Sequence, residues 1–135
     1  MNRRLGVLLL ALLLVACGQA AAGPGDPARG QQLFSGALPI AAGKAPPCAN
    51  CHVVNVGEQA SIGRNLSNIG TRAATTVPDQ SAVEYLRTSI IDPDAYLVGG
   101  FQEGIMYREY RPALTEQQLN DMVAYLPTLQ SGRDE

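Results

Sequence analysis

The chain has 135 residues, of which 46% are hydrophobic and 16% charged, and its formal net charge is −2. This length suits one small domain with a single hydrophobic core. The slight acidic excess argues against nucleic-acid binding, which relies on a basic surface. Three cysteines and one histidine are the residue types that can bring metal or redox chemistry to so small a chain.

The first 16 residues have the pattern of an export signal, which predicts their cleavage. A positive start, MNRR, precedes the apolar run LGVLLLALLLVA, which is too short to span a bilayer. The run ends in LVAC, which resembles the lipobox of bacterial lipoproteins, with Cys17 as the acylated residue. The alternatives are an ordinary signal peptide or an uncleaved anchor, with Cys17 incidental. The resemblance implies an exported protein, anchored to a membrane by acylated Cys17 and facing the periplasm or extracytoplasmic side.

The first helix of the folded part is predicted to begin at Asp26 and Pro27, an N-cap followed by proline in the first turn. Gly30 and Phe34 lie one turn apart on it, and offer a point of close approach and an aromatic side chain for the core.

If the signal is removed, Arg3 and Arg4 leave with it and the net charge becomes −4. Acylation of Cys17 would leave two other thiols, in a compartment where free thiols tend to be oxidised.

Cys48, Cys51 and His52 form the motif CANCH, which allows three interpretations. A structural zinc site needs four ligands, typically with a second Cys or His pair further along, and the chain has no such pair because His52 is its only histidine. A redox dithiol is expected between a strand and a helix, whereas the flanking sequence is rich in Pro, Gly and Asn and helical in pattern. The third interpretation is haem c, with thioether bonds from both cysteines and His52 as an iron ligand. The spacing favours haem, because a short helical turn presents both sulfurs to one porphyrin edge.

The second axial ligand of such an iron has to come from elsewhere in the chain, and it cannot be a histidine. Met106 lies in a glycine-rich segment, VGGFQEGIMYREY, which is free to bend toward an iron. Met122 falls on the apolar face of a predicted helix and is expected in the core. Lys44, the only lysine, is expected to be solvated. Met106 is therefore the candidate ligand, and its alternative role is that of a gap-filling apolar side chain.

Two further helices are predicted. The middle one covers roughly residues 79–91, with Val83, Leu86 and Ile90 facing inward, and stops at the Asp-Pro pair that follows. The last one begins at Thr115, which has the spacing of a capping box with the glutamine three residues later. Proline at position 127 is expected to end or kink it near residue 126. The expected fold class is all-α.

From Asp26 to about Leu129 the order of motifs resembles a class I (mitochondrial-type) monohaem cytochrome c domain, especially those of membrane respiratory complexes such as terminal oxidases or alternative complex III. The matching segments, in chain order, are ARGQQLF, CANCH, GRNLSNIGTRA, YLRTSIIDPDAYLVGGFQEGIM and LTEQQLNDMVAYLPTL. The resemblance implies crossed N- and C-terminal helices, with Tyr125 against Phe34, around one covalent haem. It also implies a cytochrome c domain over residues 26–130, a lipid-anchor linker over 17–25 and a C-terminal tail over 131–135.

The resemblance also implies haem-binding roles outside CANCH. The carbonyl of Arg64, in GRNL, would accept the ring N–H of His52, and Leu66 of the same motif would contact the haem. Arg72 would pair with a haem propionate, with an exposed arginine as the alternative. Tyr96 or Tyr85 would donate to the other propionate or pack on the porphyrin.

Two departures from the family pattern are visible. Tyr107 stands where the family has proline after the ligand methionine, which predicts a weaker iron–sulfur bond or a more mobile loop. Residues 35–47 separate Phe34 from Cys48 where compact members have only a few residues, and are expected to form an ordered flap near a haem edge or part of a docking surface. Arg108 and Arg111, beside the Met106 segment, are expected to make a small positive patch.

These features predict a membrane-tethered monohaem c-type cytochrome that carries single electrons between respiratory or photosynthetic membrane complexes, as a bound subunit rather than a free shuttle. It is expected to be an electron-transfer protein and no enzyme, with redox proteins and a membrane as partners and no small-molecule substrate. Two alternatives remain: a haem enzyme or gas or redox sensor in which Met106 is labile, and a dithiol or metal protein without haem.

Overall fold

Within residues 22–60 and 62–130, the ranges that the computed structural model describes, the chain forms helices and turns and no strand. The elements are α1 (Pro27–Ser35), η1 (Ala41–Gly43), η2 (Cys48–Asn50), α2 (Ile69–Thr76), α3 (Ala82–Ile91), α4 (Tyr110–Ala113), α5 (Glu116–Tyr125) and η3 (Leu126–Thr128), where η denotes a 3₁₀ turn. The predicted all-α class is confirmed. The predicted signal peptide 1–16, Cys17 and the tail 131–135 lie outside the described residues.

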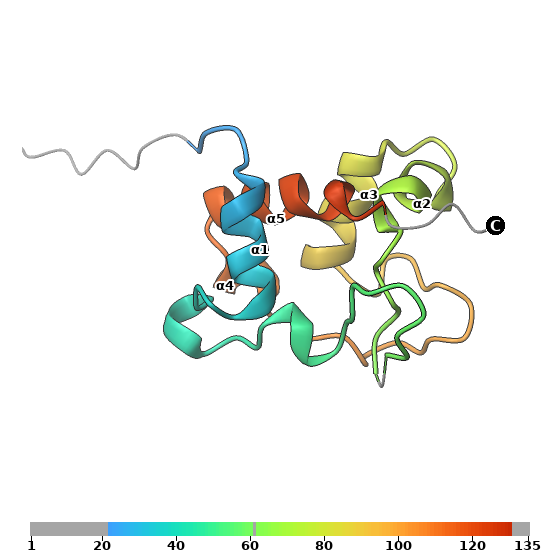
Figure 1. Cartoon of the computed structure of the whole chain (residues 1–135), viewed down its shortest axis with the longest axis horizontal. Helices are drawn as coiled ribbons and strands as arrows, with labels where there is room; N and C mark the ends of the chain where they lie inside the picture. The colour runs from blue at the N-terminus through green and yellow to red at the C-terminus, as the bar shows by residue number, and fades with distance from the viewer. Residues whose placement is uncertain (1–21, 61, 131–135) are drawn as a thin grey trace, which may run out of the picture.

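Helices α1 and α5 cross each other, as the sequence predicted (Figure 1). The crossing is tight because a Cβ at Gly30 would lie 2.6 Å from Cβ of Tyr125 and closer still to the carbonyl oxygen of Asp121. Beside this contact the rings of Phe34 and Tyr125 pack with centroids 5.6 Å apart. The predicted close approach and aromatic pair are both confirmed, and they join the two ends of the domain.

The predicted starts of the first and last helices are confirmed by their caps. The carboxylate of Asp26 accepts hydrogen bonds from the backbone N–H groups of Ala28 and Arg29. Thr115 and Gln118 form a reciprocal capping box at the start of α5. Helix α5 ends at Tyr125, and the chain then forms the single 3₁₀ turn η3, which contains Pro127.

Helix α3 begins later than predicted. Ser81 forms a capping box with Glu84, so the helix starts at Ala82 rather than near residue 79. Leu86 and Ile90 face the core as expected, but Val83 is 53% exposed, and the prediction that it faces inward is wrong. The buried stripe of α3 runs through Ala82, Tyr85, Leu86 and Ile90, and Val83 lies at the edge of this stripe, where it faces solvent.

Two helices were not predicted. In α2 the buried residues are Ile69 and Ala73, and the N–H of Gly70 donates to the carbonyl of Leu129, 3.0 Å away. Contact with the end of the chain thus fixes this eight-residue helix. The other, α4, is a single turn whose buried residue is Tyr110.

The described end of the predicted linker packs against α5. The N–H of Gly23 donates to the side-chain oxygen of Gln117 over 2.6 Å, and Asn120 donates to the carbonyl of Gly23 over 3.0 Å. A Cβ at Gly25 would lie 2.6 Å from the carbonyl carbon of Asn120. The chain is therefore held to the domain from Gly23 onward. No helix among the described residues combines the length and apolarity that crossing a bilayer requires.

Candidate functional site

A deep, mainly apolar pocket lies between the helices and the two long loops. The empty space within it, open mouth included, is about 1270 Å³. Most of the predicted site residues line this pocket, together with side chains from α1, α3 and α5; they are Cys48, Cys51, His52, Arg64, Leu66, Tyr85, Tyr96 and Met106. Residues more than 50 positions apart in the sequence thus meet around one concave, mainly apolar cavity, the kind of site in which proteins hold cofactors.

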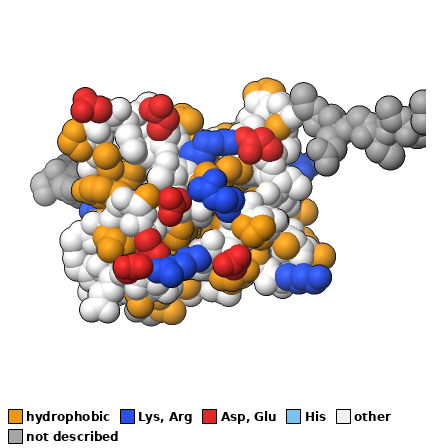
Figure 2. Space-filling view, turned by 180° about the vertical axis from the view of Figure 1, so that it is seen from behind, with side chains coloured by type: hydrophobic (Ala, Val, Ile, Leu, Met, Phe, Trp, Pro, Cys, Tyr) orange, Lys and Arg blue, Asp and Glu red, His pale blue; other side chains and the backbone are white. Residues whose placement is uncertain are grey.

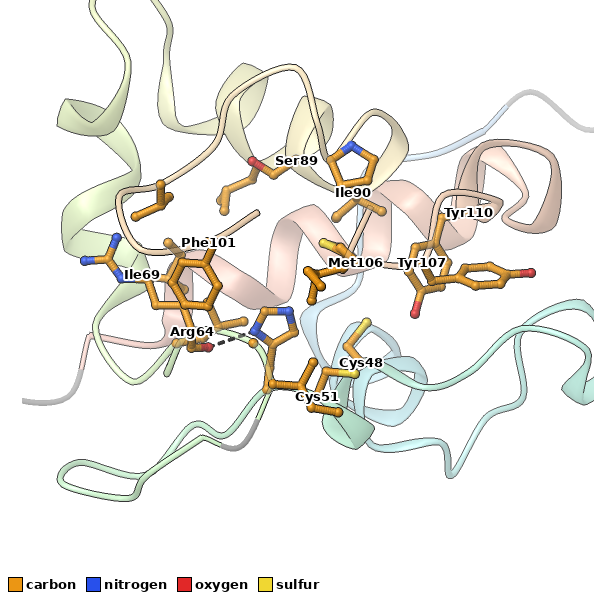
Figure 3. Close-up of a pocket in the computed structure, with 18 of the residues that line it drawn as sticks. Cys48, Cys51, Arg64, Ile69, Ser89, Ile90, Phe101, Met106, Tyr107 and Tyr110 are labelled. Atoms are coloured by element: carbon orange, nitrogen blue, oxygen red, sulfur yellow. Dashed lines mark hydrogen bonds between the residues drawn. The ribbon is translucent and has the colours of Figure 1, made fainter. Parts of the chain in front are cut away.

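The two cysteines are presented by a tight turn. The N–H of Cys51 donates to the carbonyl of Cys48 over 3.1 Å, and that of His52 donates to the same carbonyl over 3.0 Å. Both cysteines are free and half-buried, and Figure 3 shows Cys48, Cys51 and Met106 converging on the same space. This is the short helical presentation that the spacing of CANCH predicted.

The thiol of Cys48 lies in an apolar setting. Burial raises its pKa to about 11, although a hydrogen bond with Tyr110 opposes this effect. Burial also raises the pKa of the Tyr110 hydroxyl, and the charge of a nearby Cys48 thiolate would raise it further. A thiol that stays protonated at neutral pH is a poor nucleophile, which argues against a reactive dithiol. Among the described residues no group of three or more His, Cys, Asp or Glu side chains forms a metal cluster, which leaves the zinc interpretation without support.

His52 is held in one orientation by the segment that follows it. Its Nδ1 lies 2.7 Å from the carbonyl oxygen of Arg64, the contact drawn as a dashed line in Figure 3. A carbonyl can only accept, so Nδ1 carries the proton and the lone pair of Nε2 is available to a metal. The backbone of this segment is tied down as well, because Gly63 N–H donates to Cys51 and Leu66 N–H donates to Val53.

Both candidate methionines line the pocket, but Met122 belongs to a helix whereas Met106 belongs to a loop. Met122 is 1% exposed and lies on α5 within the core, as predicted. Met106 is half-buried on the loop between α3 and α4. Lys44 is exposed and does not line the pocket.

Tyrosines border the pocket on two sides. Tyr85 and Tyr96 pack edge to face with centroids 6.3 Å apart, and Tyr96 remains 45% exposed. Tyr107 packs edge to face on Tyr110 at 4.8 Å, and the hydroxyl of Tyr110 donates to the carbonyl of Pro46 over 2.8 Å. Sequence reasoning missed Tyr110, because only the fold brings it to Pro46 and Cys48.

The two predicted haem-binding arginines differ in their relation to the pocket. Arg72, on α2, donates to the side chain of Asn68 and to the carbonyl of Asn65, and it does not line the pocket. Its pairing with a haem propionate stays a prediction. Arg64 does line the pocket.

The expected positive patch is weakened by pairing. The guanidinium of Arg108 lies 2.5 Å from the carboxylate of Asp94 and 3.0 Å from that of Glu103. Arg111 is exposed. On the face seen in Figure 2, acidic and basic side chains are interspersed rather than gathered by sign.

A family model described as cytochrome c matches residues 27–130 of the chain. The chain belongs to the cytochrome c family. Comparison with curated proteins found no match. Membership means that the cofactor is haem c, bound covalently through the cysteines of the CANCH motif, and that the domain transfers electrons.

The residues of this cytochrome c domain fit that cofactor. Gly63 leaves room for the ring of His52, since a Cβ there would lie 2.5 Å from Cε1 of the imidazole. Haem iron supplies reversible one-electron chemistry when bound. The apolar walls from α1, α3 and α5 exclude water, while η2 aims both cysteine side chains at one side of the cavity.

Proposed function

We propose that this cytochrome c is tethered to a membrane and carries single electrons between respiratory or photosynthetic membrane complexes, as a bound subunit of one of them. One observation supports the electron-transfer site most directly: the Nδ1–H of His52 donates to the Arg64 carbonyl, so Nε2 is free as a ligand within the pocket. In this proposal His52 and Met106 would hold the haem iron.

The proposed ligand pair has consequences for chemistry. A thioether together with an imidazole would favour the ferrous state of the iron and raise its reduction potential relative to two nitrogen ligands. The hydrogen bond to Arg64 keeps the imidazole from rotating when the electron arrives or leaves. With Met106 bound, external ligands have no open coordination position, which suits a carrier better than an enzyme.

The second candidate function is a haem enzyme or sensor in which Met106 is displaced by substrate or gas. One observation favours it: Tyr107 stands where the family resemblance implies a proline after the ligand methionine.

Absorption spectroscopy of the purified holoprotein separates the two functions. Haem that acid acetone does not extract, with a ferric thioether-to-iron charge-transfer band that Met106→Ala abolishes, supports the carrier. Met122→Leu is the matched control, because it removes the other pocket thioether at similar volume, and the band should persist. Absence of the band from the wild type, with ready CO binding to the ferrous form, would overturn the carrier and support the alternative.

The tether is proposed from the lipobox-like LVAC and Cys17. Because the chain is bound to α5 from Gly23 onward, only the residues between positions 17 and 23 set the reach, at most about 20 Å when extended. Such a short tether supports a bound subunit over a shuttle. Replacement of Cys17 by serine should abolish acylation seen by mass spectrometry and release the protein from membranes. Retention of the variant on membranes would overturn the lipid anchor.

The partner is proposed to be a membrane complex that holds the domain without a lysine-rich docking ring. The chain has only one lysine, Lys44, and Arg108 is paired with carboxylates. Co-purification after mild solubilisation tests this proposal. A stable complex that survives raised salt is expected, whereas rapid exchange of the domain at physiological salt would indicate a shuttle.

A further inference from the structure

The loop that carries Met106 is long and has little regular structure of its own. It runs from Asp92 to Glu109, between α3 and α4, without a helix. Two of its glycines, Gly100 and Gly104, have positive φ values of 91° and 79°. Loops of this length inside a small domain need local support to hold one conformation.

Asp94 ties the two ends of this loop together. One of its carboxylate oxygens accepts the backbone N–H of Gly104 over 3.0 Å, and the other lies 2.5 Å from the guanidinium of Arg108. The tied positions 104 and 108 bracket Met106. Glu103 adds a second carboxylate to Arg108 at 3.0 Å, but its side chain is 72% exposed, against 21% for Asp94. The more buried carboxylate therefore carries the stronger part of the contact.

The residue after Met106 is fixed on the other side of the loop. Tyr107 packs on Tyr110, whose hydroxyl donates to the carbonyl of Pro46, two residues before Cys48. Tyr110 is only 4% exposed, so this anchor is buried. The tyrosine pair thus connects the Met106 loop to the segment that presents the cysteines, at the position where the family has a proline.

We propose that Asp94 is a positioning residue, which holds Gly104 and Arg108 so that the thioether of Met106 stays in the pocket. This inference rests on the proposed ligation by Met106. Without Asp94 the segment around Met106 loses its link to the start of the loop and keeps the contact of Tyr107 with Tyr110, so it opens more often. In place of a proline after Met106, the loop is held by an ionic contact between Asp94 and Arg108 and by an aromatic contact between Tyr107 and Tyr110.

The test is displacement of the thioether from the ferric holoprotein by added imidazole, followed by loss of the charge-transfer band. Asp94→Ala removes both contacts and should raise the apparent affinity for imidazole about tenfold, the effect of losing one partly exposed charge-assisted contact and one hydrogen bond. Asp94→Asn keeps an acceptor for Gly104 but loses the charge, and should fall between wild type and Asp94→Ala. Arg111→Gln, at an exposed arginine on α4, is the control and should bind imidazole like the wild type.

Three results would overturn the proposal in distinguishable ways. An unchanged imidazole affinity in Asp94→Ala, with a band that Met106→Ala abolishes, rejects the role of Asp94 and leaves ligation by Met106 standing. A lower free energy of unfolding in Asp94→Ala without a change in imidazole affinity shows a structural role only. Absence of the band from the wild type rejects both the positioning role and the proposed ligation.

Discussion

Gly63 lies directly against the imidazole ring of His52. A Cβ at position 63 would come within 2.5 Å of Cε1 and 2.7 Å of Nδ1. The same ring donates to the carbonyl of the next residue, Arg64, over 2.7 Å. One short segment therefore sets both the position and the tautomer of the proposed iron ligand.

We predict that Gly63→Ala displaces the imidazole. The added methyl group cannot be accommodated by rotation alone, because the hydrogen bond to Arg64 restrains the ring on the same side. Overpacking of this kind costs about 1–3 kcal/mol. Chemical denaturation of the holoprotein should show a lower free energy of unfolding, and the ferric spectrum should shift.

The control is Gly99→Ala, because nothing lies within 4 Å of a Cβ at Gly99. It removes the same backbone freedom in a loop without a steric clash. Equal effects of the two substitutions would contradict a steric role for Gly63.

A second prediction concerns the crossing of α1 and α5. Gly30→Ala would place a methyl group against the backbone of Asp121 and Cβ of Tyr125, so the helices have to separate. We expect a loss of about 2 kcal/mol or more in the free energy of unfolding, together with weaker packing of Phe34 on Tyr125. Gln31→Ala, at an exposed position of α1, should leave stability within about 0.5 kcal/mol of the wild type. Wild-type stability of Gly30→Ala would show that the crossing tolerates a wider spacing.

A third prediction concerns pH. Asp121 is fully buried on α5, and although desolvation opposes its ionisation, hydrogen bonds from Asp26, Gln117 and Arg29 hold its pKa below the usual range. A carboxyl whose pKa is lowered on folding stabilises the protein above its unfolded pKa, about 3.9, and loses this contribution as pH falls through the folded pKa. The free energy of unfolding of the wild type should therefore fall as the pH drops below about 4.

Asp121→Asn should cost about 2 kcal/mol at pH 7, because the amide turns a donor toward the N–H groups that faced the carboxylate. The difference between wild type and variant should narrow as the pH is lowered toward 3. Glu109→Gln, at an exposed residue, is the control for general charge effects. A difference that stays constant between pH 7 and 3 would show that ionisation of Asp121 does not stabilise the fold.

The features predicted correctly from the sequence are those with a local cause. The CANCH turn, the cap at Asp26 and the capping box at Thr115 each depend on residues within four positions of one another. The contact of Phe34 with Tyr125 was predicted through the family resemblance, since no local pattern pairs two residues so far apart.

The features that were missed depend on contacts distant in sequence. Helix α2 is short and is fixed by Leu129, and Tyr110 gains its role only where it meets Pro46 and Cys48. Val83 satisfied the apolar spacing of a helix, but the stripe that faces the core runs through Ala82, Tyr85, Leu86 and Ile90 and leaves Val83 at its edge. Apolar spacing alone did not show which side of Val83 the core would cover.

The last prediction asks which arginine influences the reduction potential. A guanidinium near the haem favours the ferrous state, which carries one positive charge fewer, so its removal should lower the potential. Arg64 lines the pocket, whereas Arg72, on α2, donates to Asn68 and Asn65, which precede the helix, and does not line the pocket. Arg64→Gln keeps the backbone carbonyl that accepts from His52 and removes only the charge.

We therefore expect Arg64→Gln to lower the potential by about 20–60 mV, which corresponds to about 0.5–1.4 kcal/mol for one electron. Arg72→Gln should change the potential less but lower the free energy of unfolding, since it disrupts the contacts of Arg72 with Asn68 and Asn65. Equilibrium redox titration and denaturation of the same two variants measure both effects. A larger fall in potential for Arg72→Gln would instead favour the propionate role that the family resemblance implies for Arg72, and would mean that the haem draws this side chain toward the pocket.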